Sequence, residues 1–241
     1  MATNHYQVLV TLSSYNEAKN IPQLIPKILQ LGYECILVDD GSIDGTAELA
    51  ERLGARVVRH RFNLGQGWAV LTGFKAAMAE ECDVIIEMDA DGQHDPAEIP
   101  NFIKKMHETG ADIVVGSRIL GSNHPNAPFF RKKLLPYYTS LINNLTGYAI
   151  TDSMCGFRAF RKSSLTKVLP VLDVMLEPQY LAAEMFLRFS RAGLTIAEIP
   201  INMQDRFTGS SYKGFIRYGL GVLKAISKTL LDPNFRKTRT M

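Results

Sequence analysis

Residues 87–96, with the sequence EMDADGQHDP, are better suited to bind a metal ion than any other segment of this chain. Asp89 and Asp91 follow an apolar run, and carboxylates this close repel each other unless a cation or hydrogen-bond donors hold them. Oxygen ligands without a nearby cysteine suit Mg²⁺ or Mn²⁺, which keep positions open for phosphate oxygens. Gln93 and His94 are placed to complete or orient such a site. The alternative is a plain strand exit, because Asp and Gly favour turns.

Polar side chains also follow other apolar runs of the chain. Asp39 and Asp40 end one run, residues 13–17 (SSYNE) end another, and residues 116–118 (GSR) end a third. In an open α/β sheet, ligands bind beyond the carboxyl ends of the strands, so these residues should meet at one edge. Carboxylates there can accept hydrogen bonds from the N–H groups of a base or from ribose hydroxyls. Four polar strand ends at one edge predict a binding site.

A small glycine loop, FNLGQG at residues 62–67, precedes a predicted helix. Glycines let the backbone approach a phosphate, and the start of a helix favours anions. The sequence has neither GxGxxG nor a Walker lysine, which disfavours a dinucleotide oxidoreductase and a P-loop ATPase. A Gly-x-Ser-x-Gly nucleophile elbow is also absent.

Alternating strand and helix signals predict the elements that must position these residues. Asp44 is a predicted N-cap of a helix that ends at Gly54, and residues 95–98 form a predicted capping box. The βαβα order predicts a doubly wound α/β fold, a mostly parallel sheet with helices on both faces. The runs rich in Val, Ile and Leu are typical of strands buried on both faces, and they lie at residues 7–12, 35–39, 56–60, 83–89, 112–117 and 194–201.

Length, cysteines and charge narrow the class of protein. A chain of 241 residues suits one large domain, and three scattered cysteines disfavour a disulfide framework and a structural zinc site. We expect a reducing compartment, no signal peptide and no membrane span. The net charge of +3 divides unevenly: from Arg206 onward, eight basic residues and one acidic residue give +7, which leaves −4 for residues 1–205. A basic end favours a polyanionic or membrane-surface partner, although a merely solvated end is the alternative. Nucleic acid is not an expected partner, because no DNA- or RNA-binding module is present.

Short motifs in a fixed order resemble glycosyltransferase family 2, and within it the dolichyl- and polyprenyl-phosphate mannose synthase group. The resemblance implies a GT-A fold, a nucleotide-sugar donor, inversion at the anomeric carbon, Mg²⁺ or Mn²⁺, and often a polyprenyl-phosphate acceptor. The motifs are SSYNE (13–17), VDDGSIDGT (38–46), NLGQG (63–67), MDADGQHDP (88–96), VGSR (115–118), GFRAFR (156–161), AEMFLR (183–188) and EIPINMQDRFTGSS (198–211).

The same resemblance implies roles for individual residues. Asp91 and Gln93 resemble the metal ligands, and Arg206 resembles the arginine that holds the donor diphosphate. Arg118 and Arg131 are similar in placement to contacts of the acceptor phosphate. The implied donor contacts are Ser13, Tyr15, Glu17, Asp40, Asp89, Ala90 and Arg206.

The acceptor decides which further groups the reaction needs. A sugar hydroxyl needs a base, for which Glu184 and Glu177 are candidates, although Glu184 could instead pair with Arg188. A lipid phosphate needs only cations, which Arg118, Arg131 and the neighbouring lysines supply. We therefore expect transfer of mannose or glucose from a GDP- or UDP-hexose to polyprenyl or dolichyl phosphate, with Asp91, Arg206 and Glu184 as catalytic residues. A glycan or small-molecule hydroxyl acceptor is the alternative, and a silent binding subunit is the non-enzymatic one.

We expect a GT-A catalytic domain at residues 1–205, divided into a nucleotide-sugar half (1–118) and an acceptor half (119–205). Residues 206–241 form a basic C-terminal segment whose residues 215–231 predict an amphipathic helix. Such a helix can lie in the headgroup region of a membrane, or it can pack its apolar face on the domain. The expected location is cytoplasmic and peripheral at the membrane surface, with a small membrane protein as a further candidate partner.

Overall fold

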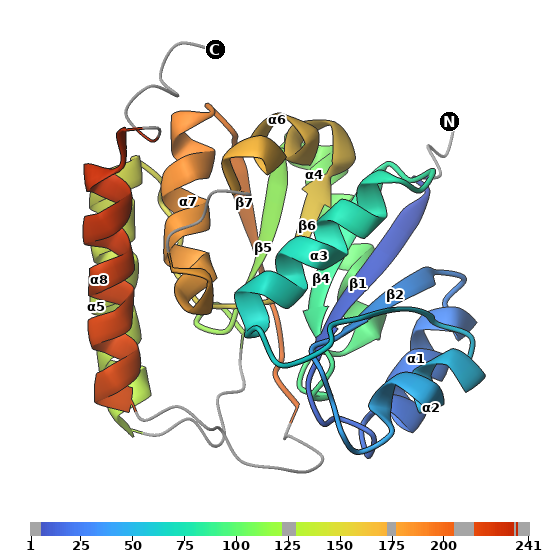
Figure 1. The fold of residues 1–241 in the computed structure, drawn as a ribbon. Coiled ribbons are helices and arrows are strands. Elements are labelled where there is room, and N and C mark those ends of the chain that lie inside the picture. The colour runs from blue at the N-terminus through green and yellow to red at the C-terminus, as the bar shows by residue number, and fades with distance from the viewer. Residues whose placement is uncertain (1–5, 122–128, 173–176, 205–214, 234, 236–241) are drawn as a thin grey trace.

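The computed structural model of the protein describes residues 6–121, 129–172, 177–204, 215–233 and 235, without the side chains of 129–134, 178 and 215–218 (Figure 1). Its centre is one seven-stranded sheet in the order β3-β2-β1-β4-β6-β5-β7. All neighbouring strands pair in parallel except β6, which runs antiparallel to β4 and β5. The strands are β1 (Val8–Ser14), β2 (Glu34–Asp39), β3 (Arg56–Arg59), β4 (Val84–Asp89), β5 (Ile113–Ser117), β6 (Arg158–Arg161) and β7 (Ile196–Pro200).

Helices cover both faces of this sheet, as the strand pattern predicts, because successive side chains of a strand point to opposite faces. On β1, for example, Leu9 joins the core on one face while Val10 and Leu12 join the core on the other. The first face carries α3 (Gln66–Met78), α5 (Phe129–Thr146), α6 (Lys162–Leu172), α7 (Leu181–Arg191) and α8 (Phe215–Leu231). The second carries α1 (Ile21–Gln30), α2 (Thr46–Arg52) and α4 (Ile99–Thr109), and two 3₁₀ turns, η1 (Pro96–Glu98) and η2 (Pro178–Tyr180), precede α4 and α7.

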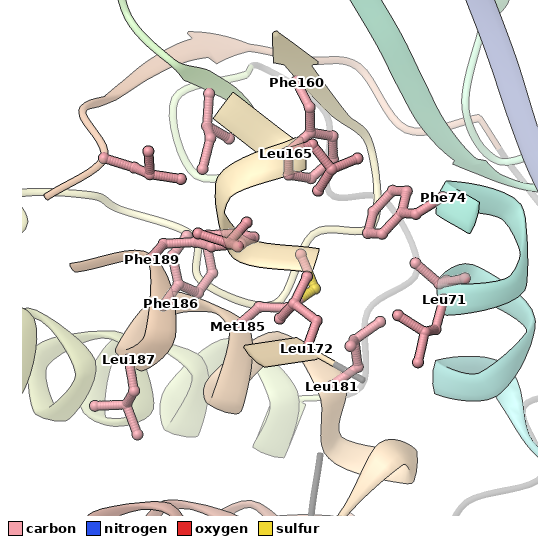
Figure 2. Packing of buried hydrophobic residues seen from close by; sticks show 14 of the residues in the cluster. Leu71, Phe74, Phe160, Leu165, Leu172, Leu181, Met185, Phe186, Leu187 and Phe189 are labelled. Carbon is pink, nitrogen blue, oxygen red and sulfur yellow. The ribbon is translucent and has the colours of Figure 1, made fainter. Parts of the chain in front are cut away.

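Aromatic rings from three elements join the larger core (Figure 2). Phe74 of α3 meets Phe160 of β6 edge-on, with ring centroids 5.1 Å apart, and Phe160 in turn lies 6.0 Å from Phe189 of α7. Such pairs stabilise a core beyond the burial of their area, by about 0.5–1.5 kcal/mol each. The contact fixes α7 relative to α3, which matters because both helices begin near the site described below.

The C-terminal helix α8 packs on the domain. Val222 and Ile226 are buried in the same core, and α8 lies against α7 and η2 (Figure 1). Its opposite side leaves Leu220 and Leu231 well exposed. One apolar side of α8 therefore packs on the domain, as in the second of the two arrangements expected for this helix, and further leucines stay exposed on the other side. Among the described residues, no helix is both long enough and apolar enough to cross a membrane.

Local details differ from the sequence prediction at two helices. The N-cap of α2 is Gly45, with φ of 85°, while the Asp44 carboxylate accepts the N–H of Thr46 at 3.1 Å and that of Ala18 at 3.0 Å. At η1, Asp95 caps Ala97 as predicted, but the Glu98 carboxylate accepts the N–H of Asn202. In both places the carboxylate of a predicted capping residue accepts an N–H from a residue that is distant in the sequence.

Candidate active site

Asp89 lies where β1, β4 and α3 meet. Ser13 and Asp89 are opposite each other in the parallel register, and Ser13 Oγ donates to Asp89 Oδ1 at 3.1 Å. Gln66, at the first position of α3, donates from Nε2 to the same oxygen at 2.8 Å. A Cβ at Gly156 would stand 3.1 Å from Asp89 Oδ2, so glycine leaves that oxygen room. Sequence reasoning missed Gln66 and Gly156, whose only signal was their place in the NLGQG and GFRAFR motifs.

Asp91 follows on the turn after β4 and is 6% exposed. Its Oδ1 accepts the N–H of Gln93 at 3.0 Å, and Gly92 between them adopts a φ of 77° that favours glycine. Ala90 is buried, and its N–H donates to the Ser13 carbonyl. The turn thereby holds Asp89, Asp91 and Gln93 on one short stretch at the carboxyl edge of the sheet.

This donor set fits a metal ion that the protein shares with a substrate. Within the described residues, no group of three His, Cys, Asp or Glu side chains could hold a metal alone. Mg²⁺ and Mn²⁺ accept one or two carboxylates and complete their shell with substrate phosphates and water. Oxygens of Asp91 and Gln93 beside Asp89 match that pattern, because all of them are hard ligands.

His94 packs against the end of β4. It is 4% exposed, its ring stacks on Phe157 with centroids 5.0 Å apart, and its Nδ1 accepts the Asp89 N–H at 3.3 Å. Burial lowers the pKa of His94 despite the nearby Asp89 and Asp91 carboxylates, so the imidazole is neutral at pH 7. A neutral imidazole can accept that hydrogen bond, which gives His94 the orienting role that the sequence left open.

Asp40 organises the glycine loop. Its two oxygens accept the N–H groups of Leu64 and Gly65 at 2.9 and 2.8 Å, and Oδ1 lies 2.7 Å from Nδ1 of His60. Asp40 as a whole is 3% exposed. The neighbouring Gly41 has a φ of 78°, and a Cβ there would stand 2.6 Å from the Phe62 carbonyl carbon. Asp40 therefore holds the loop that precedes Gln66.

The loop after β1 presents Tyr15 to solvent, 42% exposed. Asn16 adopts a φ of 56°, and it is fixed by Ser42 Oγ, which accepts its N–H, and by the Ile43 N–H, which donates to its side chain. Glu17 donates its N–H to Thr46 Oγ1. Beside this loop lies an open cavity of about 380 Å³, lined by Gly41, Ser42, Ile43, Arg59, His60 and Arg61. Nothing in the sequence pattern had marked Arg59, His60 or Arg61 as a candidate site residue.

Arg118 follows β5 and is held by a partner that the sequence analysis missed. Its Nε and Nη2 donate to the two oxygens of Asp152, at 2.5 and 2.8 Å. Asp152 is fully buried, and the Glu198 carboxylate of β7 accepts its N–H and that of Thr151. The side chain of Arg131 and all of Arg206 lie outside the described residues.

Glu184 lies in the first turn of α7 with no exposed surface. Its Oε1 accepts from Arg188 at 2.6 Å, and Arg188 also contacts Asp232 at 3.1 Å. Its Oε2 accepts the N–H of Glu177 at 3.3 Å. This is the pairing that the sequence offered as the alternative to a catalytic base.

Comparison with known proteins decides the family. Residues 10–169 match the family model described as glycosyl transferase family 2. The chain belongs to glycosyltransferase family 2. This enzyme is 32% identical over 215 residues to undecaprenyl-phosphate mannosyltransferase of Micrococcus luteus, covering 85% of this chain and 86% of the relative. It is 31% identical over 215 residues to polyprenol monophosphomannose synthase of Mycolicibacterium smegmatis, covering 85% and 80%.

The fold of this family 2 glycosyltransferase is GT-A, as the sequence predicts. Glucosyl-3-phosphoglycerate synthase from Mycobacterium tuberculosis, solved with Mn²⁺ and UDP-glucose, superposes with a TM-score of 0.68. The match covers 94% of this chain and 78% of that one at 21% identity. As a member of family 2 with relatives named as mannosyltransferases, the protein is a nucleotide-sugar glycosyltransferase, an enzyme rather than a silent binding subunit.

Proposed function

We propose that this glycosyltransferase moves mannose or glucose from a GDP- or UDP-hexose to polyprenyl or dolichyl phosphate, with inversion at the anomeric carbon. The observation that carries the proposal is the convergence of Ser13 and Gln66 on Asp89, beside Asp91. Two relatives named for transfer of mannose to polyprenyl phosphates support the acceptor class. The exposed Tyr15 and the cavity next to it have the size and place to receive a nucleoside.

The proposed cofactor is Mg²⁺ or Mn²⁺ on Asp91 and Gln93, a choice that the complex of the solved relative with Mn²⁺ and UDP-glucose supports. The metal would supply positive charge to the departing diphosphate. Asp89 is the proposed contact to the sugar nucleotide. Its Oδ1 already accepts two hydrogen bonds, so Oδ2, which faces Gly156, is the oxygen with room for a ligand.

Arg206 is the proposed second charge on the diphosphate. The last residue described before it, Gln204, lies beside the proposed metal ligands: its N–H donates to the Gln93 carbonyl at 2.9 Å, and its side chain donates to Asp95 at 2.8 Å. An arginine that reached the diphosphate from this segment would stabilise the charge that develops on the leaving group.

The acceptor phosphate needs cations but no base, since it is already an anion. Asp152 compensates much of the charge of Arg118, so we assign a larger share to Arg131, Lys132 and Lys133 of α5. The ion pair of Arg118 with Asp152 also favours a second candidate function, transfer to a hydroxyl acceptor, which carries less charge than a phosphate. That acceptor would need a base, and the ion pair of Glu184 makes it a weaker candidate than the sequence suggested.

A screen of donors and acceptors tests the proposal. GDP-mannose, UDP-glucose and related donors are incubated with Mn²⁺ and one of three acceptors: a short polyprenyl phosphate, the matching polyprenol or 3-phosphoglycerate. Nucleotide release and glycosylated product are both scored. We expect product only with the polyprenyl phosphate. Transfer to a soluble hydroxyl acceptor, with none to the lipid phosphate, would replace the proposal by its alternative.

We further propose a peripheral location at the cytoplasmic membrane surface, with residues 206–241 as the contacting segment. The support is the outer side of α8, where Leu220, Leu223 and Leu231 are 64%, 41% and 69% exposed beside Lys224. The test is sedimentation with anionic and neutral liposomes, comparing the wild type with Leu220→Ser/Leu223→Ser/Leu231→Ser. Binding to anionic liposomes at low salt should be lost in the variant, since apolar burial and attraction to anionic lipid act together. Equal binding of the wild type and the variant would show that another surface of the protein contacts the membrane.

A further inference from the structure

The 3₁₀ turn η2 lies between the C-terminal helix and the start of α3. It packs against both α8 and α3. Its Gln179 lies next to the glycine loop, since a Cβ at Gly65 would be in ordinary van der Waals contact with Gln179 Cγ, at 3.7 Å. Gly65 donates to Asp40, and the next residue, Gln66, donates to Asp89. The 3₁₀ turn η2 thus packs next to the residues that orient Asp89.

One stripe of α8 faces η2. Gly221, Lys224 and Lys228 are three and four residues apart, so they share a side of the helix. A Cβ at Gly221 would overlap the Tyr180 ring, at 1.8 Å from Cζ. The two ammonium groups lie 2.9 and 2.6 Å from the same carboxylate oxygen, Oε1 of Glu177. Glycine thus allows the close approach, and the lysines bind the residue that precedes η2.

A buried ion-pair network reaches Glu177 by a second path. Asp232, just after α8, contacts Arg188, which pairs with Glu184. Glu184 in turn accepts the backbone N–H of Glu177. All three network side chains are less than a tenth exposed, so removing one partner would leave a buried charge uncompensated. The C-terminal end of α8 thus fixes the backbone of Glu177, while its middle fixes the side chain.

The carboxylate of Glu177 compensates the charges of both lysines in this contact. Lys224 and Lys228 are like charges at i and i+4, which repel each other unless an anion lies between them. Hydrogen bonds from Lys228 and Lys224 lower the pKa of Glu177, so its carboxylate is ionised at neutral pH. The lysine side chains are 60% and 47% exposed, against 16% for Glu177. Ion pairs this exposed add little to the free energy of unfolding. Their main effect is therefore to hold η2 in place.

We propose that Glu177 is a positioning residue for the sugar donor. Held by Lys224 and Lys228, it keeps η2 against Gly65, and η2 keeps the glycine loop and Gln66 in the arrangement that orients Asp89. The inference rests on the proposed function only in taking a nucleotide-sugar as the ligand of that arrangement. It assigns Glu184 to the same task, through the backbone of Glu177.

Trp68 offers a readout that needs no turnover. It is the one tryptophan of the sequence, and it lies in the first turn of α3, where its backbone N–H donates to the Gly65 carbonyl. Loosening of η2 should raise the quenching of its fluorescence by acrylamide. Glu177→Gln and Lys224→Gln/Lys228→Gln are compared with the controls Glu81→Gln and Lys104→Gln, which change exposed charges away from this contact.

We expect both test variants to raise the KM for the donor about two- to fivefold, the range for a partly exposed ion pair, with kcat near that of the wild type. Quenching of Trp68 should rise in parallel, and both effects should be absent in the controls. The triple variant should be no worse than Glu177→Gln alone, because the three residues form one contact. Glu177→Asp, which keeps the charge, should restore part of the donor affinity.

The two proposals fail in different ways. If no donor supports transfer to a lipid phosphate, but Glu177→Gln still raises Trp68 quenching and weakens binding of GDP or UDP with Mn²⁺, the acceptor assignment falls and the positioning role stands. If quenching and donor KM stay at wild-type values in both test variants, the positioning role is wrong, whatever happens to the melting temperature. The lysine variant keeps the test valid should Glu177→Gln fold poorly, because both lysines are surface residues.

Discussion

Arg118 and Asp152, 34 residues apart in the chain, form a bidentate ion pair with N–O distances of 2.5 and 2.8 Å. The Asp152 carboxylate also accepts the backbone N–H groups of Arg118 and Met154. The pair ties the end of β5 to the turn that leads into β6. Arg118 therefore fixes this turn. Because Asp152 compensates much of its charge, Arg118 has less charge to offer an acceptor phosphate.

Asp152→Asn should destabilise the protein by about 3 kcal/mol at neutral pH, because it leaves Arg118 without its buried partner. Burial alone would raise the pKa of Asp152, but the hydrogen bond and charge of Arg118 outweigh it and the pKa lies below its ordinary value of 3.8. The pair therefore contributes stability above pH 3.8, and this is lost as the pH falls through the lower folded-state pKa. Denaturant unfolding from pH 7 downward measures it. A difference from the wild type that stays constant at acid pH would contradict the assignment.

Asp91→Ala should abolish transfer and leave the fold intact. Loss of a metal contact should cost at least about 3 kcal/mol of transition-state stabilisation, a rate loss of about 100-fold or more. Nucleotide release at saturating Mn²⁺ is the measurement, and circular dichroism checks the fold. Near-normal turnover would remove Asp91 from the metal site.

Arg206→Ala should lower kcat more than it weakens donor binding, because its charge is proposed to act on the developing diphosphate. We expect kcat to fall about 100-fold, with a donor Kd that changes far less. Single-turnover rates and equilibrium binding of the donor separate the two effects. A large loss of affinity with an unchanged rate at saturation would instead make Arg206 a ground-state contact.

Gly41→Ala should disturb the donor site, and Gly45→Ala is its matched control. Both glycines have a positive φ, 78° and 85°, so alanine is strained at either by about 1–2 kcal/mol. Only at Gly41 would the new Cβ also meet backbone, 2.6 Å from Phe62. The donor KM and the thermal midpoint should both worsen more for Gly41→Ala. Equal effects of the two changes would show that the loop held by Asp40 can move without cost.

Much of the site follows from the sequence because parallel strands end at a common edge. The apolar runs locate β1, β2, β4 and β5, and the polar residues after each of them then meet without further information. Ser13 opposite Asp89 is such a case, since two neighbouring strands in register bring their next residues together. The order of short motifs added the family, and with it the GT-A fold.

The tertiary structure decided the partners that come from outside this pattern. β6 enters between β4 and β5 in the opposite direction, which brings Gly156 to Asp89 and the preceding turn, with Asp152, to Arg118. Helix α8 returns to η2, which turns Glu177 from a candidate base into a partner of two lysines. A sequence records local period and burial, whereas these pairings depend on how distant segments pack against one another. Residue types alone therefore predicted the carboxylates, and only the packing showed which of them are already bound.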